Sequence, residues 1–255
     1  MIFPSLILFL GYIPLFVFSV RGQIPSYKTP WIWIPILGHS LILGYWGWTQ
    51  LWGQSFFALS LLSFVLLASF QILRINHKFE ALGGINIPLG MIFLILSVLI
   101  PNAQRNANQS WWVFLHVMLI LVGFACFAIS FGHSVLFLFV RHRLKSKQLK
   151  GIGFFPSLEK LDRYNHSATI VGFICLMSGV CSAWLWSLDS GRWKWDSGTI
   201  GALVLCAIYA VSIHARIVFG RRMHWTAWFS IGGFALLFVI LGLVGYLGGW
   251  HMGEA

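Results

Sequence analysis

Nine histidines supply most of the polar chemistry in a chain that consists largely of apolar runs. With a helix rise of about 1.5 Å per residue, four of them fall at two matched depths. His39 and His214 lie at one depth, toward the inner ends of their predicted helices, and His116 and His251 lie at the outer surface. Two neutral imidazoles from different helices are what an octahedral haem iron accepts as axial ligands. The histidine pattern therefore predicts two bis-histidine haem levels.

Other metal chemistry fits these residues less well. A zinc site would need three or four ligands including Cys, Asp or Glu, and a proton relay would need buried carboxylates, whereas the predicted spans contain no carboxylate. The four cysteines lie within spans and form neither a CxxC pair nor a CxxCH motif, so we interpret them as small packing residues. The remaining histidines are interpreted as interfacial polar residues, and His133 as bonded to a neighbouring helix.

The stretch "RWKWDSG" alternates charged residues with Trp193 and Trp195 between two apolar runs. One interpretation is an ordinary aromatic belt at the membrane surface. The other is a flat shelf on which a haem macrocycle packs, with a neighbouring cation paired to a propionate. In that case Asp196 could orient an imidazole by accepting its second N–H group.

The elements that must position these residues are predicted to be membrane-spanning helices. The chain is 58% hydrophobic and 9% charged, which exceeds what a soluble domain could bury. We expect an all-α, polytopic membrane protein forming a single transmembrane domain over residues 1–255. Its eight predicted spans are 4–20, 31–49, 55–73, 85–101, 112–140, 168–187, 198–219 and 226–249. The net charge is +11, and the basic residues lie between these apolar runs, which indicates a role in membrane topology rather than nucleic-acid binding.

The basic residues also predict the orientation. Of the 17 lysines and arginines, all but Arg105, Arg192 and Lys194 follow odd-numbered spans and so lie on one side. By the positive-inside rule that side is cytoplasmic, so both termini and "RWKWDSG" are expected outside. The first apolar run lacks a basic flank and a small-residue cleavage site, and is counted as a span. We expect a multi-pass protein of the bacterial cytoplasmic (inner) membrane.

Four stretches, in order over about residues 110–251, resemble the cytochrome c assembly membrane-protein family, which includes CcsA, CcmC and HemX-like haem-handling proteins. They are "WWVFLHVMLILVGFACFAISF", "PSLEKLDRYNHSATIVGF", "YAVSIHARIVFGRRMHWTAWFSIGGF" and "GGWHMG". The first 110 residues match weakly beyond a histidine in the second span. The tryptophan tract keeps the family's W-x-W-D core but lacks its leading W-G and trailing P-K-E, which favours the HemX-like branch.

The resemblance implies two haem sites with separate residues. The outer site would use His116, His251, Trp193, Trp195 and Asp196. The inner site would use His214, with Arg216 nearby and His39 as partner. In both sites the histidines would be axial ligands of the haem iron.

The function that the resemblance implies is haem handling in cytochrome c biogenesis. Haem b would pass from the inner level to the external loop for delivery. A partner membrane protein with a periplasmic domain, together with apocytochrome c, would complete a haem-lyase system, so this chain is not expected to be an enzyme by itself. Two alternatives remain: a HemX-like regulator or scaffold of tetrapyrrole synthesis, and a solute transporter, for which no inverted repeat or broken helix is visible.

Overall fold

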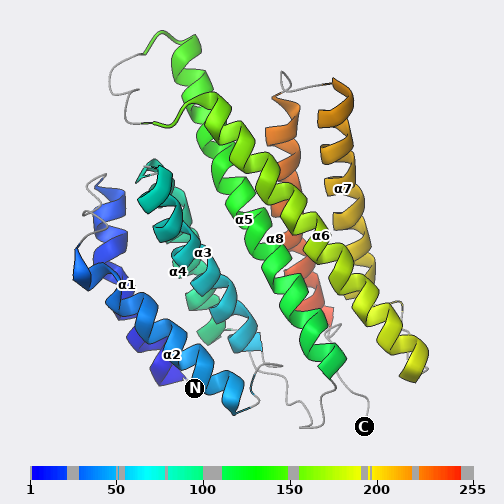
Figure 1. Cartoon of the computed structure of the whole chain (residues 1–255). Coiled ribbons are helices and arrows are strands. Elements are labelled where there is room, and N and C mark those ends of the chain that lie inside the picture. The colour runs from blue at the N-terminus through cyan, green and yellow to red at the C-terminus, as the bar shows by residue number, and fades with distance from the viewer. Residues whose placement is uncertain are drawn as a thin grey trace. The chain divides into compact units, whose positions relative to one another are not determined.

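The computed structural model describes residues 2–21, 29–49, 51, 55–77, 80–99, 111–148, 155–190, 195, 197–219 and 224–247. In this part the protein is all-helical, with eight α-helices (Figure 1). Their bounds are α1 Ile2–Val20, α2 Ile34–Trp48, α3 Ser55–His77, α4 Gly83–Leu99, α5 Trp111–Lys145, α6 Leu158–Ser190, α7 Ser197–Phe219 and α8 Trp225–Leu247. Short 3₁₀ turns at Pro30–Ile32 and Glu80–Leu82 precede α2 and α4.

The helices form two compact units. Unit 1 comprises Met1–Ala107 and Leu149–Pro156 and contains α1 to α4. Unit 2 comprises Asn108–Gln148 and Ser157–Ala255 and contains α5 to α8. The expectation of one transmembrane domain over the whole chain stays a prediction.

Among the described residues, four helices are long and apolar enough to cross a bilayer: they contain the segments Phe56–Ile75, Phe114–Lys145, Leu158–Leu188 and Gly198–Val218. In lipid a helix satisfies its own backbone hydrogen bonds, which is why such runs fold this way. The protein is a membrane protein with a helical architecture. The eight-span topology and the external termini stay predictions.

The predicted segments agree with the helices except in α6. This helix has 33 residues and begins at Leu158 rather than at the predicted 168. Its first turns are polar, so an apolar criterion misses them, yet they carry helix-start signals. The hydroxyl of Ser157 lies 3.4 Å from the amide N of Lys160, and Glu159 places a negative charge in the first turn. The longer helix brings Asp162 inside a candidate span.

In unit 2 the long helices α5 and α6 pack closely because glycines face the interface. A Cβ on Gly172 would lie 2.7 Å from the ring of Phe127, and one on Gly123 would lie 3.1 Å from the Gly172 carbonyl oxygen. Small residues allow such backbone approach between membrane helices. On its other side, Phe127 stacks on Tyr209 of α7, with ring centroids 3.6 Å apart. These contacts fix the level at which α5 and α6 residues face each other.

In unit 1 the principal helix pair is α3 with α4. A Cβ on Gly90 would lie 2.8 Å from Leu67 Cγ, so these two residues mark the register of the pair. The hydroxyl of Ser19 in α1 donates to the Gly83 carbonyl at the start of α4, at 2.7 Å. The C-terminal end of helix α1 therefore packs against the N-terminal end of α4.

Candidate functional site

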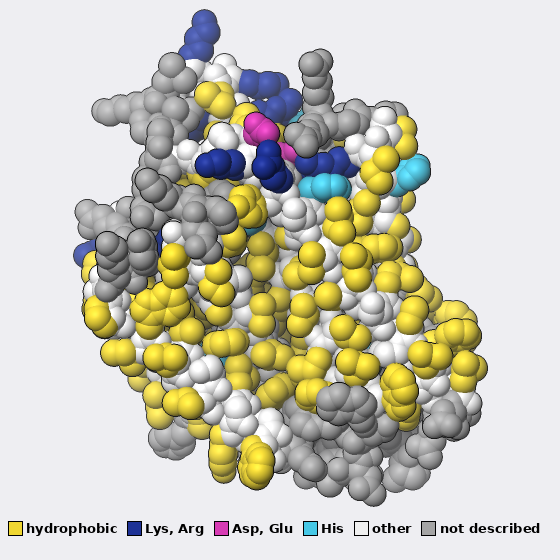
Figure 2. Space-filling view, viewed as in Figure 1, with side chains coloured by type: hydrophobic (Ala, Val, Ile, Leu, Met, Phe, Trp, Pro, Cys, Tyr) yellow, Lys and Arg dark blue, Asp and Glu magenta, His cyan; other side chains and the backbone are white. Residues whose placement is uncertain are grey.

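A polar layer lies in unit 2 at the end where α5 finishes and α6 begins. Around this end, Figure 2 shows Lys and Arg side chains next to acidic ones, and hydrophobic side chains predominate among the described residues below them. We call it the inner polar layer, and its members on the four helices are Ser130, His133, Ser134, Asp162, Asn165, Thr169, Arg216, Thr226 and Ser230. These side chains are buried or partly buried although they are polar.

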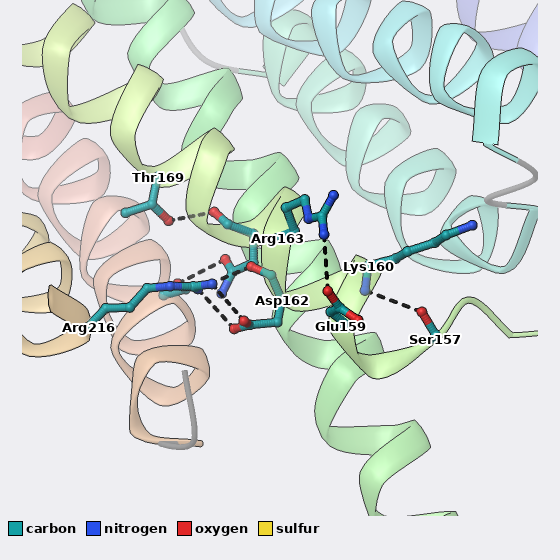
Figure 3. A network of polar contacts seen from close by, with 9 residues as sticks. Ser157, Glu159, Lys160, Asp162, Arg163, Thr169 and Arg216 are labelled. Atoms are coloured by element: carbon teal, nitrogen blue, oxygen red, sulfur yellow. Dashed lines mark hydrogen bonds and ion pairs between the residues drawn. The ribbon is translucent and has the colours of Figure 1, made fainter. Parts of the chain in front are cut away.

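The strongest contact of the inner polar layer is an ion pair between Arg216 of α7 and Asp162 of α6 (Figure 3). The guanidinium donates from Nη1 to Oδ1 at 2.9 Å and from Nη2 to Oδ2 at 2.6 Å. Nη1 also donates to the Asp162 backbone carbonyl at 3.2 Å. The two side chains are only 9% and 14% exposed, so the pair is largely shielded from solvent. This two-point geometry is the strong form of an arginine–carboxylate interaction.

Asn165 connects three helices of the same layer. Its Oδ1 accepts hydrogen bonds from the hydroxyls of Ser130 in α5 and of Ser230 in α8, the latter at 3.2 Å. Thr169 lies 2.9 Å from the Ser130 hydroxyl and donates to the Asn165 carbonyl at 2.9 Å. All four side chains are buried. The layer thus joins α5, α6 and α8 through hydrogen bonds, and α6 to α7 through the ion pair.

His214 stands on α7 two residues before Arg216 and is exposed. Two residues correspond to about 200° around an α-helix, so the two side chains leave α7 on nearly opposite sides. The Arg216 side is held against α6 by Asp162. His214 consequently points away from the interior of unit 2.

His133 is fully buried. Its Nδ1 lies 2.8 Å from the Ile129 carbonyl oxygen of its own helix, and its ring stacks on Tyr164 of α6 with centroids 5.9 Å apart. The predicted bond to a neighbouring helix stays a prediction. Both contacts are structural. His133 therefore belongs to the packing of α5 on α6.

His116 lies at the opposite end of unit 2, near the start of α5. Its Nδ1 lies 2.8 Å from the backbone carbonyl oxygen of Gly179 in α6. A carbonyl only accepts, so Nδ1 carries the proton and the neutral ring keeps its lone pair on Nε2. Metal-binding histidines commonly have their second ring nitrogen fixed by such a donation. The partly buried His116 thus has Nε2 as its unprotonated nitrogen, the one that can ligate a metal.

His39 is the corresponding candidate in unit 1, and it has a different environment. It is 0% exposed, and its Nε2 lies 2.8 Å from the Ser60 hydroxyl while Nδ1 lies 3.3 Å from the Tyr12 hydroxyl. The Phe64 ring packs against it edge-on. Both ring nitrogens are engaged, so iron ligation would require one of these hydroxyls to move.

Three of the predicted site residues, Trp193, Asp196 and His251, lie outside the described residues. Trp195 is described and is 69% exposed. His39 and His214 belong to different units, so their pairing stays a prediction. Among the predicted site residues, Arg216 has Asp162 as a side-chain partner, and His39 has Ser60 and Tyr12.

Sequence reasoning did not identify Asp162 or Gly179. A signal for Asp162 was present: the chain has only six acidic residues, and this one follows a helix-start motif rather than lying in a loop. Gly179 had no such signal, because its contribution is a backbone carbonyl. Spacing along one helix cannot reveal which carbonyl another helix offers.

The chain is similar to proteins of cytochrome c assembly and to a HemX protein. A family model described as "Cytochrome C assembly protein" matches residues 52–251. The "Cytochrome c biogenesis protein CcsA" of Prochlorococcus marinus is 26% identical over 175 residues, which cover 58% of this chain and 56% of that protein. The chain therefore spans little more than half the length of this relative.

Two further relatives align over larger shares. The protein of the same name from Heterosigma akashiwo is 24% identical over 251 residues, 80% of this chain and 77% of that protein. "Protein HemX" of Bacillus subtilis is 23% identical over 172 residues, 64% of this chain and 62% of that protein. The family match includes the whole of α5 to α8 and also α3 and α4 of unit 1.

Proposed function

The chain belongs to the cytochrome c assembly protein family, and from that premise we propose that it is a haem-binding membrane protein of cytochrome c biogenesis. In this proposal it receives haem b at an inner level and presents it at an external loop for delivery. Haem is the cargo of the protein. The relatives named as cytochrome c biogenesis proteins support the coarser role.

The observation that carries the proposal is the tautomer of His116. Its Nδ1–H is held by the Gly179 carbonyl at 2.8 Å, which leaves Nε2 as the nitrogen able to ligate iron. The ring is also partly exposed, unlike that of His133, so a ligand can approach it. A neutral, oriented imidazole near a helix end fits one axial position of a haem iron.

The remaining assignments complete two sites. At the outer site His251 would supply the second axial nitrogen, while Trp193 and Trp195 pack on the macrocycle and Asp196 orients an imidazole. At the inner site His214 and His39 would be the ligands, and Arg216 would act from the other side of α7 through its ion pair with Asp162. The exposure of His214 supports this assignment.

Delivery to a cytochrome needs a second protein in this proposal. A partner membrane protein with a periplasmic domain would hold apocytochrome c, and the present chain would act as the haem-handling subunit of a haem-lyase system in a bacterial inner membrane.

Reporter fusions test the orientation of the chain in the membrane. A reporter active only outside the cytoplasm should be active after residues 105 and 195 and at the C-terminus, and inactive after 147 and 221. Activity after 147 would overturn the depth assignments.

The absorption spectrum of the purified full chain tests the proposal directly. Protein from haem-replete cells should show a Soret band, and His214→Ala should lower haem content more than His133→Ala. His214 is exposed on α7, whereas His133 is enclosed between α5 and α6. Equal haem content in the two variants would refute the inner site. A colourless wild type would favour the regulatory or scaffold role in tetrapyrrole synthesis.

The tryptophan loop has its own test. Replacing Trp193 and Trp195 together by alanine should lower retained haem while protein abundance stays near wild type. Each large aromatic contributes roughly 1–3 kcal/mol of contact, or about 5- to 150-fold in affinity. The matched control replaces Trp111 and Trp112, which should matter less. Unchanged haem in the first variant would return the loop to an aromatic belt.

A further inference from the structure

We propose that Asp162 is a positioning residue for His214. Its two-point ion pair with Arg216 fixes both the rotation and the depth of α7 against α6, and thereby aims the imidazole. The inference rests on the proposed haem-binding role of His214. It adds a residue of α6 and a mechanism of placement that the ligand assignment does not contain.

The geometry makes this coupling direct. Arg216 and His214 are on one helix, two residues apart, and leave it on nearly opposite sides. Side-chain ends lie about 5–6 Å from the helix axis, so a rotation of α7 by about 20° would displace the imidazole by about 2 Å. A functional site tolerates about 0.5 Å. Whatever holds Arg216 therefore determines where His214 points.

The two-point geometry of the Arg216–Asp162 pair orients α7 better than a single charge–charge contact would. Two parallel N–H···O bonds, at 2.9 and 2.6 Å, define an orientation, whereas a single bond allows a helix to pivot. The third bond, from Nη1 to the Asp162 carbonyl, ties the guanidinium to the α6 backbone as well. A lysine has a point charge on a flexible stem and cannot reproduce this planar fork.

A second ion pair on α6 differs from the Arg216–Asp162 pair because both of its residues lie on the same helix. Glu159 and Arg163, on either side of Asp162 along α6, form a contact at 3.0 Å with side chains 66% and 67% exposed. Both residues belong to one helix, so their contact cannot set the position of another (Figure 3). They provide a control that alters charge on α6 close to Asp162 without removing the Arg216–Asp162 pair.

The test measures haem bound by the purified full-length protein, its spectrum, and protein abundance. Arg216→Lys keeps the charges but loses the fork, and should weaken haem binding at the inner site about tenfold at near-normal abundance. Added imidazole should then restore the bis-imidazole spectrum, because the defect is a misdirected ligand. The reversed pair Asp162→Arg/Arg216→Asp should recover at least about half of the wild-type haem. The control Glu159→Gln/Arg163→Gln should bind haem like the wild type.

Wild-type haem content in Arg216→Lys would overturn the inference while leaving the haem-binding proposal intact. A loss of haem in Arg216→Lys that imidazole does not restore would also overturn it, because it would indicate a merely structural defect. An equal loss in the Glu159/Arg163 control would assign the effect to local charge. If the wild type itself contains no haem, the proposed function fails, and the two failures are therefore distinguishable.

Discussion

The two compact units treat their buried polar side chains differently. In unit 2 the buried amide and ion pair bond from helix to helix, Arg216 to Asp162 and Asn165 to the hydroxyls of two other helices. Ser134 Oγ and Tyr209 Oη of the same unit are nevertheless buried without a hydrogen-bond partner among the described residues.

Unit 1 also has a bonded group of this kind, His39 with the Ser60 and Tyr12 hydroxyls, but its buried amides differ. In unit 1, Asn86 is 0% exposed, and neither its amide nitrogen nor its oxygen has a hydrogen-bond partner among the described residues. The Oε1 atom of Gln71, also buried, likewise has none there.

The difference therefore lies in the buried amides: Asn165 joins three helices of unit 2, whereas Asn86 and Gln71 of unit 1 keep spare hydrogen-bonding capacity. A bonded polar layer specifies one arrangement of four helices, and unit 2 places the His116 and His214 side chains on that arrangement. An unsatisfied buried amide specifies nothing about its neighbours, and it costs free energy relative to an apolar residue of similar size. We infer that the precision needed for ligand placement is concentrated in α5 to α8.

The largest expected effect comes from removing one partner of the buried ion pair. Asp162→Ala leaves the Arg216 guanidinium uncompensated, and should lower the stability of unit 2 by about 3–5 kcal/mol. Thermal unfolding of the purified protein, followed by tryptophan fluorescence, measures the change.

The control is a double replacement, Asp162→Leu/Arg216→Met, which removes both charges and should cost much less than the single variant. If the double variant is as unstable as Asp162→Ala, the uncompensated charge is not the cause. The contrast between the units would then lose its electrostatic basis.

The sequence predicts the helices of both units well but their contacts poorly. Long apolar runs separated by polar loops give seven of the eight helices with bounds within a few residues. The predicted span 168–187 begins later than α6 because the first turns of α6 are polar. Its start at Leu158 is indicated by the capping residue Ser157 and the acidic Glu159, not by hydropathy. Apolar periodicity reports which residues avoid water, and a helix that extends beyond the lipid does not need to be apolar there.

The candidate site is partly predictable for the same reason. Helix depth identified His116 and His214 as polar residues at defined levels, because rise per residue is constant. Depth does not identify what a ring nitrogen contacts. His39 matched His214 in depth, yet Ser60 and Tyr12 enclose it, and both contacts are made by other helices.

The second prediction uses that difference between the units. His116→Gly and His39→Gly should each weaken haem binding at their own site, by at least about tenfold for an axial ligand, which corresponds to about 1.4 kcal/mol. Added imidazole should rescue His116→Gly, whose site is partly open, and should fail to rescue His39→Gly, whose site is closed to solvent. The Soret absorbance per protein, titrated with imidazole, provides the measurement.

Rescue of both variants would mean that unit 1 opens readily and that burial of His39 does not limit access. If imidazole rescues neither variant, His116 affects haem binding through helix packing rather than by ligating the iron. Only the split result supports two units with different accessibility.

The smallest effects are expected from two asparagines that differ only in their bonding. Asn165→Leu removes the acceptor shared by Ser130 and Ser230 and should destabilise the protein by about 1–2 kcal/mol. Asn86→Leu removes an amide with no described partner and should leave stability unchanged or raise it slightly, because the desolvation cost of that amide disappears. The two substitutions are chemically identical and both sites are buried, so size and hydrophobicity cancel in the comparison. Thermal midpoints of the two variants, measured in the same detergent, give the difference directly. A loss of stability in Asn86→Leu as large as that in Asn165→Leu would mean that Asn86 is bonded in the membrane, and that unit 1 relies on polar contacts as much as unit 2 does.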